Sequence, residues 1–388
     1  MDVYISFPLL ISSIVLFLTW LAFNWWNNNR KIPPGPWGLP FLGYYPFLSV
    51  THEDFNKLSK VYGNVFSFRT LSGHLIIILN GHKTIKSVLV NRADEFDGRP
   101  LQSNLVSWFS DGLGIAQEEG EYWSQHRKFF LQAAKKFGFG KLEMEERIQD
   151  EIQQMLQVLR TEKNTDLHYV VSHTLNSVIS HVLFSKKFDR ERTFASIQSS
   201  LRKVVPIFSS NVNMIIGFPF DVIFSLLPQM SFFKSGIKEV QKLTDSVLEE
   251  QIRTHDPSIT RGYVDAYLQN RNELLAKGKP EAALFDEETS IEGYRIPKRS
   301  VIIANLWSIN CDPEIFPNPE EFDPKRFLDE KGKRVKREGP YPFSVGKRSC
   351  IGEALAQMEV FLIMSSLMQN FSIPHADKPE NLRVIPRN

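Results

Sequence analysis

Cysteine is scarce in this sequence, and several common catalytic signatures are missing. Only Cys311 and Cys350 occur among 388 residues. That density excludes a disulfide framework and favours a reducing compartment. The chain has no Gly-x-Gly-x-x-Gly fingerprint, no phosphate-binding loop, no zinc-ligand spacing and no Ser/His/Asp order. It also has no internal repeat and no low-complexity tract, so none of these patterns indicates a function.

A strong charge of either sign is missing as well. The chain carries 46 basic and 44 acidic residues, a net charge of +2. This balance gives no global electrostatic reason to expect nucleic-acid binding. Hydrophobic residues make up 42% and charged residues 23%, which excludes a disordered chain. The length allows two to three domains or one large α-rich domain.

Charged residues are absent between Val3 and Asn29. Residues 4–23 alone have the length of about 20 residues that crosses a hydrocarbon core. Three tryptophans crowd one end of the run, as at a membrane interface: Trp20, Trp25 and Trp26. A cleaved signal peptide is the alternative, but the apolar run is long and no small-x-small cleavage site precedes Trp25. Residues 1–29 are therefore predicted to form an N-terminal membrane anchor.

Positive charge follows the anchor, as Arg30 and Lys31, whereas Asp2 precedes it. Because positive flanks stay in the cytosol, the body of the protein is predicted to face the cytosol. Residues 30–50 are predicted to be a linker, since four prolines between Pro33 and Pro40 prevent a helix and stiffen the chain. The body then covers residues 51–388.

Hydrophobic periodicity predicts a body that is mostly helical with small strands. Thr51 and Asp54 form an N-cap pair before the first helix. A hairpin is expected over residues 65–69 and 74–79. The further predicted helices cover residues 121–137, 141–160, 167–184, 193–205, 234–255, 265–277 and 352–370. Short strands at 294–297 and 301–303 precede a proline-rich meander at 312–324. In the last helix, the predicted buried positions are Ala356, Val360, Met364, Leu367 and Phe371.

A cysteine lies just before the N-terminus of the last predicted helix, in the stretch FSVGKRSCIG at 343–352. Glycines let a backbone approach a large flat ligand closely. The unpaired N–H groups of a helix start stabilise a thiolate such as that of Cys350. Arg348 adds positive charge and can pair with a carboxylate. The alternative is a buried, inert cysteine.

A second pair of polar side chains lies on the helix predicted at 121–137. Trp123 and Arg127 are four residues apart, which puts the indole N–H and the guanidinium on one helix face. Both can donate to the same carboxylate. The pair is therefore a candidate anion-binding element.

The pattern Phe-x-x-Gly-x-Arg-x-Cys-x-Gly at 343–352 resembles the haem-thiolate signature of the cytochrome P450 family. The resemblance implies that Cys350 is the axial iron ligand and that Arg348 holds a haem propionate. It implies that Phe343 packs beside the sulfur. It assigns three further positions to the cofactor, two glycines that make room and one small helix residue: Gly346, Gly352 and Ala356.

Other segments are similar to the same family. The resemblance implies that Trp123 and Arg127 meet a haem propionate. The stretch FDPKRF at 322–327 matches the family's meander motif, and the proline-rich linker matches its microsomal members. A basic cluster is expected to dock an acidic reductase, with a solvated loop as the alternative: Lys331, Lys333, Arg334, Lys336, Arg337, Lys347 and Arg348.

The resemblance implies the cytochrome P450 fold, with residues 51–388 as its haem-binding, catalytic-type domain. The implied enzyme is a monooxygenase that inserts one oxygen atom into a lipophilic small molecule. Its cofactor would be haem b, with electrons from NADPH through a cytochrome reductase. The implied location is the endoplasmic reticulum membrane, with a single span and the body in the cytosol. No nucleic-acid partner is expected.

Two elements of the family are missing from the sequence. One is the long central helix over the haem, with the acid and Thr that deliver protons; the other is the Glu-x-x-Arg helix that pairs with the meander arginine. Their expected place is near residues 286–292, which predicts an internal deletion and an incomplete fold. The Glu-x-x-Arg pattern also occurs at 250–253 and 292–295. Neither stretch is taken as the missing helix, because the first lies in a different helix and the second contains Gly293.

The deletion has consequences for activity and packing. No residue is assigned to catalysis. Arg326 is expected to lack its carboxylate, and the last helix is expected to expose Phe361, Met364, Leu367 or their neighbours. The alternative function is a catalytically inactive truncated isoform that binds haem or partners at the membrane.

Overall fold

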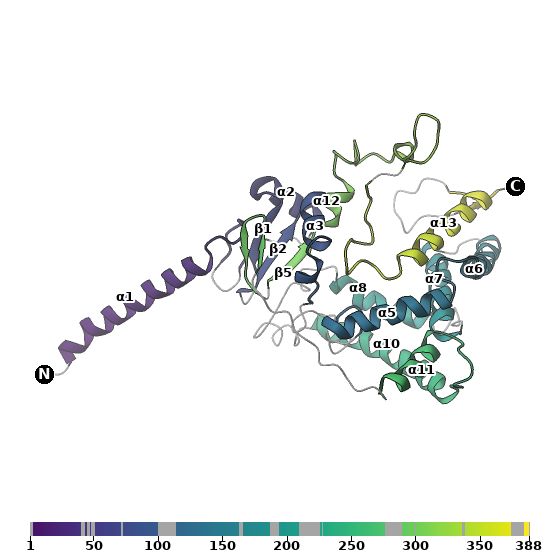
Figure 1. The fold of residues 1–388 in the computed structure, drawn as a ribbon, viewed down its shortest axis with the longest axis horizontal. Coiled ribbons are helices and arrows are strands. Elements are labelled where there is room, and N and C mark those ends of the chain that lie inside the picture. The colour runs from purple at the N-terminus through teal and green to yellow at the C-terminus, as the bar shows by residue number, and fades with distance from the viewer. Residues whose placement is uncertain are drawn as a thin grey trace. The chain divides into compact units, whose positions relative to one another are not determined.

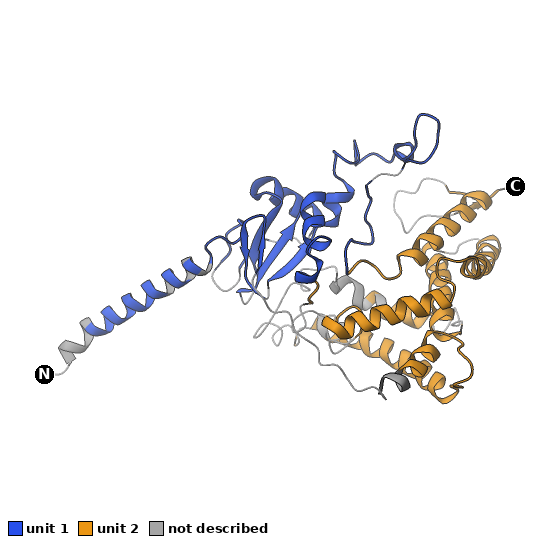
Figure 2. Ribbon diagram, in the orientation of Figure 1, with its two compact units in different colours: residues 1–96, 285–347 blue, residues 97–284, 348–388 orange. Residues whose placement is uncertain are grey.

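The computed structural model describes residues 3–39, 43–44, 47, 51–70, 73–99, 114–162, 166–186, 194–208, 226, 228–275, 289–298, 300–335, 338–373 and 384–387. The chain divides into two compact units (Figure 2). Unit 1 comprises Met1–Phe96 and Phe285–Lys347, and unit 2 comprises Asp97–Leu284 and Arg348–Asn388. The single body over residues 51–388 stays a prediction.

Unit 1 is built around a small mixed sheet (Figure 1). Strand β1 (Val65–Arg69) pairs antiparallel with β2 (Leu75–Leu79), as predicted. Strand β5 (Val301–Ala304) then joins β2 in parallel, although it lies far away in the sequence. All five residues of β2 are buried, because a central strand that is apolar throughout can be covered on both faces.

Short elements surround this sheet. Helix α2 (His52–Tyr62) begins as predicted, with the Thr51 side chain accepting a 3.2 Å hydrogen bond from the Asp54 N–H. The others are α3 (His82–Leu89), η3 (Ala93–Glu95), the hairpin β3 (Thr289–Ile291) and β4 (Tyr294–Ile296), α12 (Leu306–Asn310) and η6 (Pro324–Phe327). Helix α3 and strand β3 had not been predicted.

Strand β3 lies directly after the predicted deletion point and is fixed to η3. Arg92 donates to the Ser290 carbonyl and to the Thr289 hydroxyl, and that hydroxyl donates to Glu95 at 2.6 Å. Thr84 donates to Glu292 at 2.6 Å. Residues 286–288 lie outside the described residues. The chain that follows the junction is therefore anchored by specific polar contacts.

The N-terminal segment is helical, as α1 (Val3–Asn28). A helix was predicted here. Across the described part of the chain, however, no helix meets the combined demands of length and apolarity for crossing a bilayer. The transmembrane span is therefore not confirmed.

Unit 2 is a helical assembly. Its helices are α5 (Gly120–Lys136), α6 (Leu142–Thr161), α7 (Leu167–Phe184), α8 (Ala195–Phe208), α10 (Pro228–Arg253), α11 (Tyr263–Leu275) and α13 (Glu353–Asn370). A helix was predicted at each place, although α10 begins at Pro228 rather than at residue 234. Strand β6 (Phe371–Ser372) follows α13 and pairs with β7 (Ile385–Pro386).

The core of unit 2 lies where α13 packs on α6 and α6 packs on α7 (Figure 1). Met144, Ile148 and Ile152 recur every four residues on α6 and are fully buried. This spacing gives one apolar stripe along the helix, which is why α6 buries a single face. The buried α13 residues Leu355 and Ile363 complete the cluster.

The buried face predicted for α13 is partly wrong. Leu367 and Phe371 are buried as predicted, but Val360 and Met364 are 60% and 47% exposed. The face that packs on the core carries Leu355, Glu359, Ile363 and Leu367. Apolar residues occur all round this helix, so hydrophobic periodicity does not single out one face.

Candidate functional site

Cys350 lies just before α13, and its side chain is exposed. Gly352 is the N-cap of α13 and makes no side-chain capping hydrogen bond. A Cβ added to Gly352 would lie 4.0 Å from the Cys350 Sγ and would meet no other atom within that distance. The sulfur therefore lies close to an uncapped helix start, where backbone N–H groups favour negative charge.

Arg348 is held between a loop and α5. Its Nε donates to the Asp97 carbonyl at 2.9 Å, and its Nη2 donates to the Glu118 carbonyl at 2.7 Å. Its guanidinium carbon lies 3.7 Å from the centroid of the Trp123 ring. This distance is typical of a guanidinium stacked on an aromatic face. The backbone bonds and the stacking fix the orientation of Arg348.

One donor of Arg348 remains unused. Its Nη1 is buried and makes no hydrogen bond in the described part of the chain. The pKa of Arg348 is lowered to about 10, chiefly by burial and also by the positive charges of Arg99 and Arg127, against the raising effect of the Asp97 and Glu119 carboxylates. Arg348 is half-buried, but a buried donor atom without an acceptor is costly, so an anion that pairs with Nη1 is favoured. The arrangement is suited to a carboxylate.

Trp123 and Arg127 lie on one face of α5, as their spacing predicted. Trp123 is 2% exposed, and the Arg127 guanidinium carbon lies 5.7 Å from the centroid of its ring. Arg127 Nη2 donates to the Ser349 carbonyl at 2.9 Å. Arg127 thus binds the backbone beside Cys350. The structure brings Trp123, Arg127, Arg348 and Cys350 together within unit 2.

The remaining predicted site residues have local roles. Gly346, in unit 1, has φ +83°, and a Cβ there would lie 1.8 Å from the Leu89 carbonyl oxygen. Close approach to α3 therefore explains this glycine without a ligand. Phe343, also in unit 1, is half-buried. Ala356 is half-buried on α13, and its N–H donates to the Gly352 carbonyl at 2.9 Å.

Sequence reasoning missed the residues that complete the charge balance around Arg348. The Arg99 backbone N–H donates to the Glu119 carboxylate, and the Arg99 Nε donates to the Ala116 carbonyl at 3.2 Å. Burial lowers the pKa of Arg99, against the carboxylates of Glu119 and Asp97. These loop residues show no periodic pattern, so no sequence signal identified them.

The meander arginine has partners other than a carboxylate. Arg326 donates to three backbone carbonyls, of Asp323 and Asn318 at 3.0 Å and of Glu321 at 2.6 Å. Backbone carbonyls therefore accept hydrogen bonds from its guanidinium, so the group is not stranded. The glutamates of the two rejected Glu-x-x-Arg stretches also have other partners. Glu250 pairs with Lys186 at 2.7 Å, and Glu292 accepts from Thr84.

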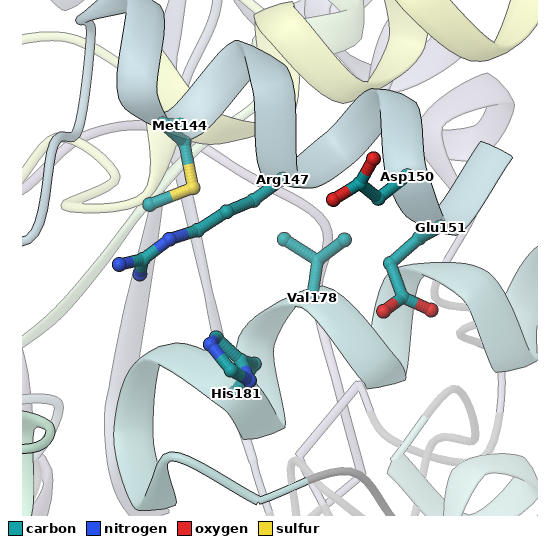
Figure 3. A pocket seen from close by; sticks show the side chains of 6 residues that line it. All are labelled: Met144, Arg147, Asp150, Glu151, Val178 and His181. Atoms are coloured by element: carbon teal, nitrogen blue, oxygen red, sulfur yellow. The ribbon is translucent and has the colours of Figure 1, made fainter.

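A separate pocket of about 100 Å³ lies between α6 and α7 (Figure 3). Arg147, Asp150 and Glu151 reach it from α6, and His181 reaches it from α7. Met144 and Val178 form its buried apolar part. None of the residues predicted to bind haem lines this pocket.

The site joins an exposed thiol at a helix start to a half-buried arginine whose Nη1 is buried and makes no hydrogen bond among the described residues. A family model described as Cytochrome P450 matches residues 33–289 and 283–383. The chain therefore belongs to the cytochrome P450 family, and its fold is the mostly helical fold of that family.

Curated relatives agree with the family model. Human cytochrome P450 2A7 is 27% identical over 98% of this chain and 95% of its own length. Mouse cytochrome P450 2A4 is 29% identical with the same coverage. Rabbit cytochrome P450 2G1 is 28% identical over 99% of this chain and 95% of its own length.

The alignments with the relatives are longer than this chain. The alignments extend over 476 and 487 positions, although this chain has 388 residues. The two stretches matched by the family model meet and overlap at 283–289. The alignments therefore contain positions that this chain lacks, and the internal deletion near 286–292 stays a prediction.

Proposed function

We propose that this chain is a haem-thiolate protein of the monooxygenase type, with Cys350 as the axial ligand of haem b. The observation that carries the proposal is the buried Arg348 Nη1, which has no hydrogen-bond partner among the described residues and lies two residues before an exposed thiol at a helix start. A haem presents both groups that such a site binds, since its iron accepts a thiolate and its propionates accept guanidinium N–H bonds.

Each residue of the site has a separate role in this proposal. Cys350 supplies the thiolate, which the uncapped start of α13 stabilises. Arg348 would hold a propionate through Nη1, and Trp123 fixes the orientation of the guanidinium by stacking on it. Arg127 fixes the cysteine loop through the Ser349 carbonyl. When bound, the thiolate-ligated haem supplies the oxygen-activating chemistry, with lipophilic small molecules as substrates and NADPH electrons delivered by a reductase.

Localisation at the endoplasmic reticulum membrane, with a single span and a cytosolic body, belongs to the same proposal. It rests on the uncharged run of residues 3–29 and on Arg30 and Lys31 after it. The part of α1 whose side chains are described exposes many large apolar residues: Leu9, Leu10, Ile11, Ile14, Val15, Leu16, Phe17, Leu18, Trp20 and Phe23. A large exposed apolar surface favours contact with a membrane or a partner.

The direct test is the carbon monoxide difference spectrum of the reduced, purified full chain. An intact iron–thiolate bond gives a strongly red-shifted Soret band, and this is the expected result. A spectrum of haem without thiolate ligation would contradict the assignment of Cys350. Purification without haem, from cells supplied with a haem precursor, would contradict the proposal as a whole.

A catalytically inactive isoform is the second candidate function. The internal deletion predicted near 286–292 favours it, because the acid and Thr expected to deliver protons belong to the helix that it would remove. Such a chain would still bind haem, or partners at the membrane, without turnover. Product formation after reconstitution with reductase and NADPH separates the two candidates.

A further inference from the structure

Helix α5 begins without a capping side chain, although its first turns carry part of the candidate site. Glu119 is the N-cap of α5 and makes no side-chain capping hydrogen bond. Its carboxylate instead accepts from the Arg99 N–H. The Trp123 N–H reaches the Glu119 carbonyl at 3.5 Å, which is longer than usual for a backbone hydrogen bond. The backbone alone therefore holds the start of α5 weakly.

A pair of side chains supplies a further attachment at this helix start. Glu118 comes just before the N-cap, and its Oε2 lies 2.5 Å from the Nδ1 of His126 in the second turn of α5. An N–H on Nδ1 donates to the carboxylate both in the imidazolium and in one neutral tautomer. Only 14% of the Glu118 side chain and 32% of the His126 side chain are exposed. The His126 ring also lies edge-on to Tyr267 of α11, with 6.5 Å between the ring centroids. The pair therefore ties the residue before α5 to the helix itself.

The backbone of Glu118 also supports Arg348. Its carbonyl accepts the 2.7 Å hydrogen bond from Arg348 Nη2, and the Trp123 ring supplies the face on which the guanidinium stacks at 3.7 Å. The carbonyl lies before α5, whereas the indole lies on α5, so the direction of Arg348 Nη1 depends on how these two supports are placed. The hydrogen bond between Glu118 and His126 fixes their placement, because it joins the residue with the carbonyl to the helix with the indole.

We propose that Glu118 and His126 are positioning residues for Arg348, and that their hydrogen bond keeps Nη1 oriented for a haem propionate. The proposal rests on the proposed function, which gives Nη1 to a propionate. A donor that is fixed before its ligand binds loses little entropy on binding. Loss of the bond between Glu118 and His126 is therefore expected to weaken haem retention, although each residue assigned to haem is still present.

The rate of haem loss from the purified full chain, measured by transfer to an excess of apomyoglobin, tests this role. Glu118→Ala and His126→Ala each break the bond, and each is expected to speed haem loss roughly tenfold. The double variant is expected to lose haem no faster than either single variant, because the two residues act as one unit. Glu121→Ala is the matched control and is expected to leave the rate unchanged, since it breaks an exposed pair with Gln125 on the same helix.

Three further measurements separate positioning from a general structural role. Arg348→Lys keeps the positive charge but lacks the planar fork, so in this background Glu118→Ala is expected to cause no further increase in the rate. His126→Gln keeps a donor for the carboxylate and is expected to restore most of the slow rate. In Glu118→Ala the reduction potential of the haem is expected to become more negative, because the propionate charge is less well compensated.

Failure of the positioning role is distinguishable from failure of the proposed function. Purification of the unsubstituted chain without haem overturns both together. If the unsubstituted chain holds thiolate-ligated haem and both alanine variants lose it at the unsubstituted rate, the positioning role alone is wrong. An increase that persists in the Arg348→Lys background, or an additive effect in the double variant, assigns the pair to general stability and likewise overturns the positioning role.

Discussion

Arg348 shows how a single side chain gives the candidate site its character. Two of its nitrogens bind backbone carbonyls and its face rests on Trp123, so the guanidinium is fixed before any ligand binds. The third nitrogen is buried and unused in the described part of the chain. Pre-organised donors lose little entropy when they bind an anion, which makes Arg348 well suited to a propionate.

The first prediction concerns the iron ligand. Cys350→Ala is expected to abolish the thiolate-type carbon monoxide difference spectrum, because the exposed thiol at the start of α13 is lost. Cys311→Ala is the matched control and is expected to leave the spectrum unchanged. Burial raises the pKa of Cys311, which disfavours its thiolate. Loss of the signal in Cys311→Ala alone would show that the assignment is wrong.

The second prediction concerns Glu359, an 8% exposed carboxyl on the core side of α13. Burial raises its pKa to about 7. The folded state therefore prefers the neutral acid, and stability is full below the unfolded pKa and falls as pH rises toward 7. Glu359→Gln removes this dependence on pH. The free energy of unfolding of Glu359→Gln minus that of the unsubstituted chain is expected to be about 2 kcal/mol larger at pH 8 than at pH 4.5.

Urea unfolding at the two pH values measures this difference. Glu143→Gln changes an exposed carboxylate on the neighbouring helix α6 and serves as the control. The prediction fails if Glu359→Gln and the unsubstituted chain lose stability in parallel between pH 4.5 and pH 8.

Local spacing made part of the site predictable. Trp123 and Arg127 share one face of α5 because four residues make about one helical turn. The partners of Arg348 were not predictable, because Asp97 and Glu118 reach it through loop closure and not through a repeating pattern. The structural reason for Gly346 was also hidden, since the nearby Leu89 carbonyl belongs to a helix that was not predicted.

At the scale of elements, the same contrast between local and long-range signals holds. The β1–β2 hairpin and the helices of unit 2 follow from periodicity and turn residues. The parallel pairing of β5 with β2 joins distant segments, and no local pattern specifies it. The orientation of α13 was misjudged because both of its faces are apolar.

The third prediction concerns the hairpin β3–β4. Arg92 fixes the start of β3 through the Ser290 carbonyl and the Thr289 hydroxyl. Arg92→Ala removes both bonds, at a cost of about 1 kcal/mol each, so amide protection of residues 289–296 is expected to fall roughly thirtyfold. Hydrogen exchange measures this change. Lys57→Ala, which breaks an exposed pair with Asp54 on α2, is the control. Unchanged protection in Arg92→Ala would mean that this attachment does not hold the hairpin.

At the scale of the whole molecule, the fourth prediction concerns topology. The uncharged run of residues 3–29 followed by Arg30 and Lys31 predicts one span with a cytosolic body. Protease added to sealed microsomes is expected to digest the chain after about Lys31. Lumenal proteins in the same vesicles must remain intact as a control. Protection of the body would reverse the predicted orientation, and release of the chain by alkaline carbonate would argue against a span.

The last prediction is that this chain has little or no monooxygenase turnover, even when it binds haem. The two stretches matched by the family model overlap at 283–289, and the deletion predicted near 286–292 would remove the helix expected to carry an acid and a Thr. Delivery of protons by a positioned group typically contributes about 10²–10⁴-fold to a rate. Trp123, Arg127, Arg348 and Cys350 belong to unit 2 and do not depend on the missing segment for the contacts that the structure records.

Haem binding and turnover are therefore expected to separate. Purified protein reconstituted with reductase and NADPH is expected to form product from lipophilic substrates at least about 100-fold more slowly than a full-length relative assayed in parallel. The carbon monoxide spectrum of the same sample establishes that the thiolate-ligated haem is present. Turnover comparable to that of the relative would show that the missing segment is dispensable for catalysis. In that case, residues that are present in this chain would have to deliver the protons.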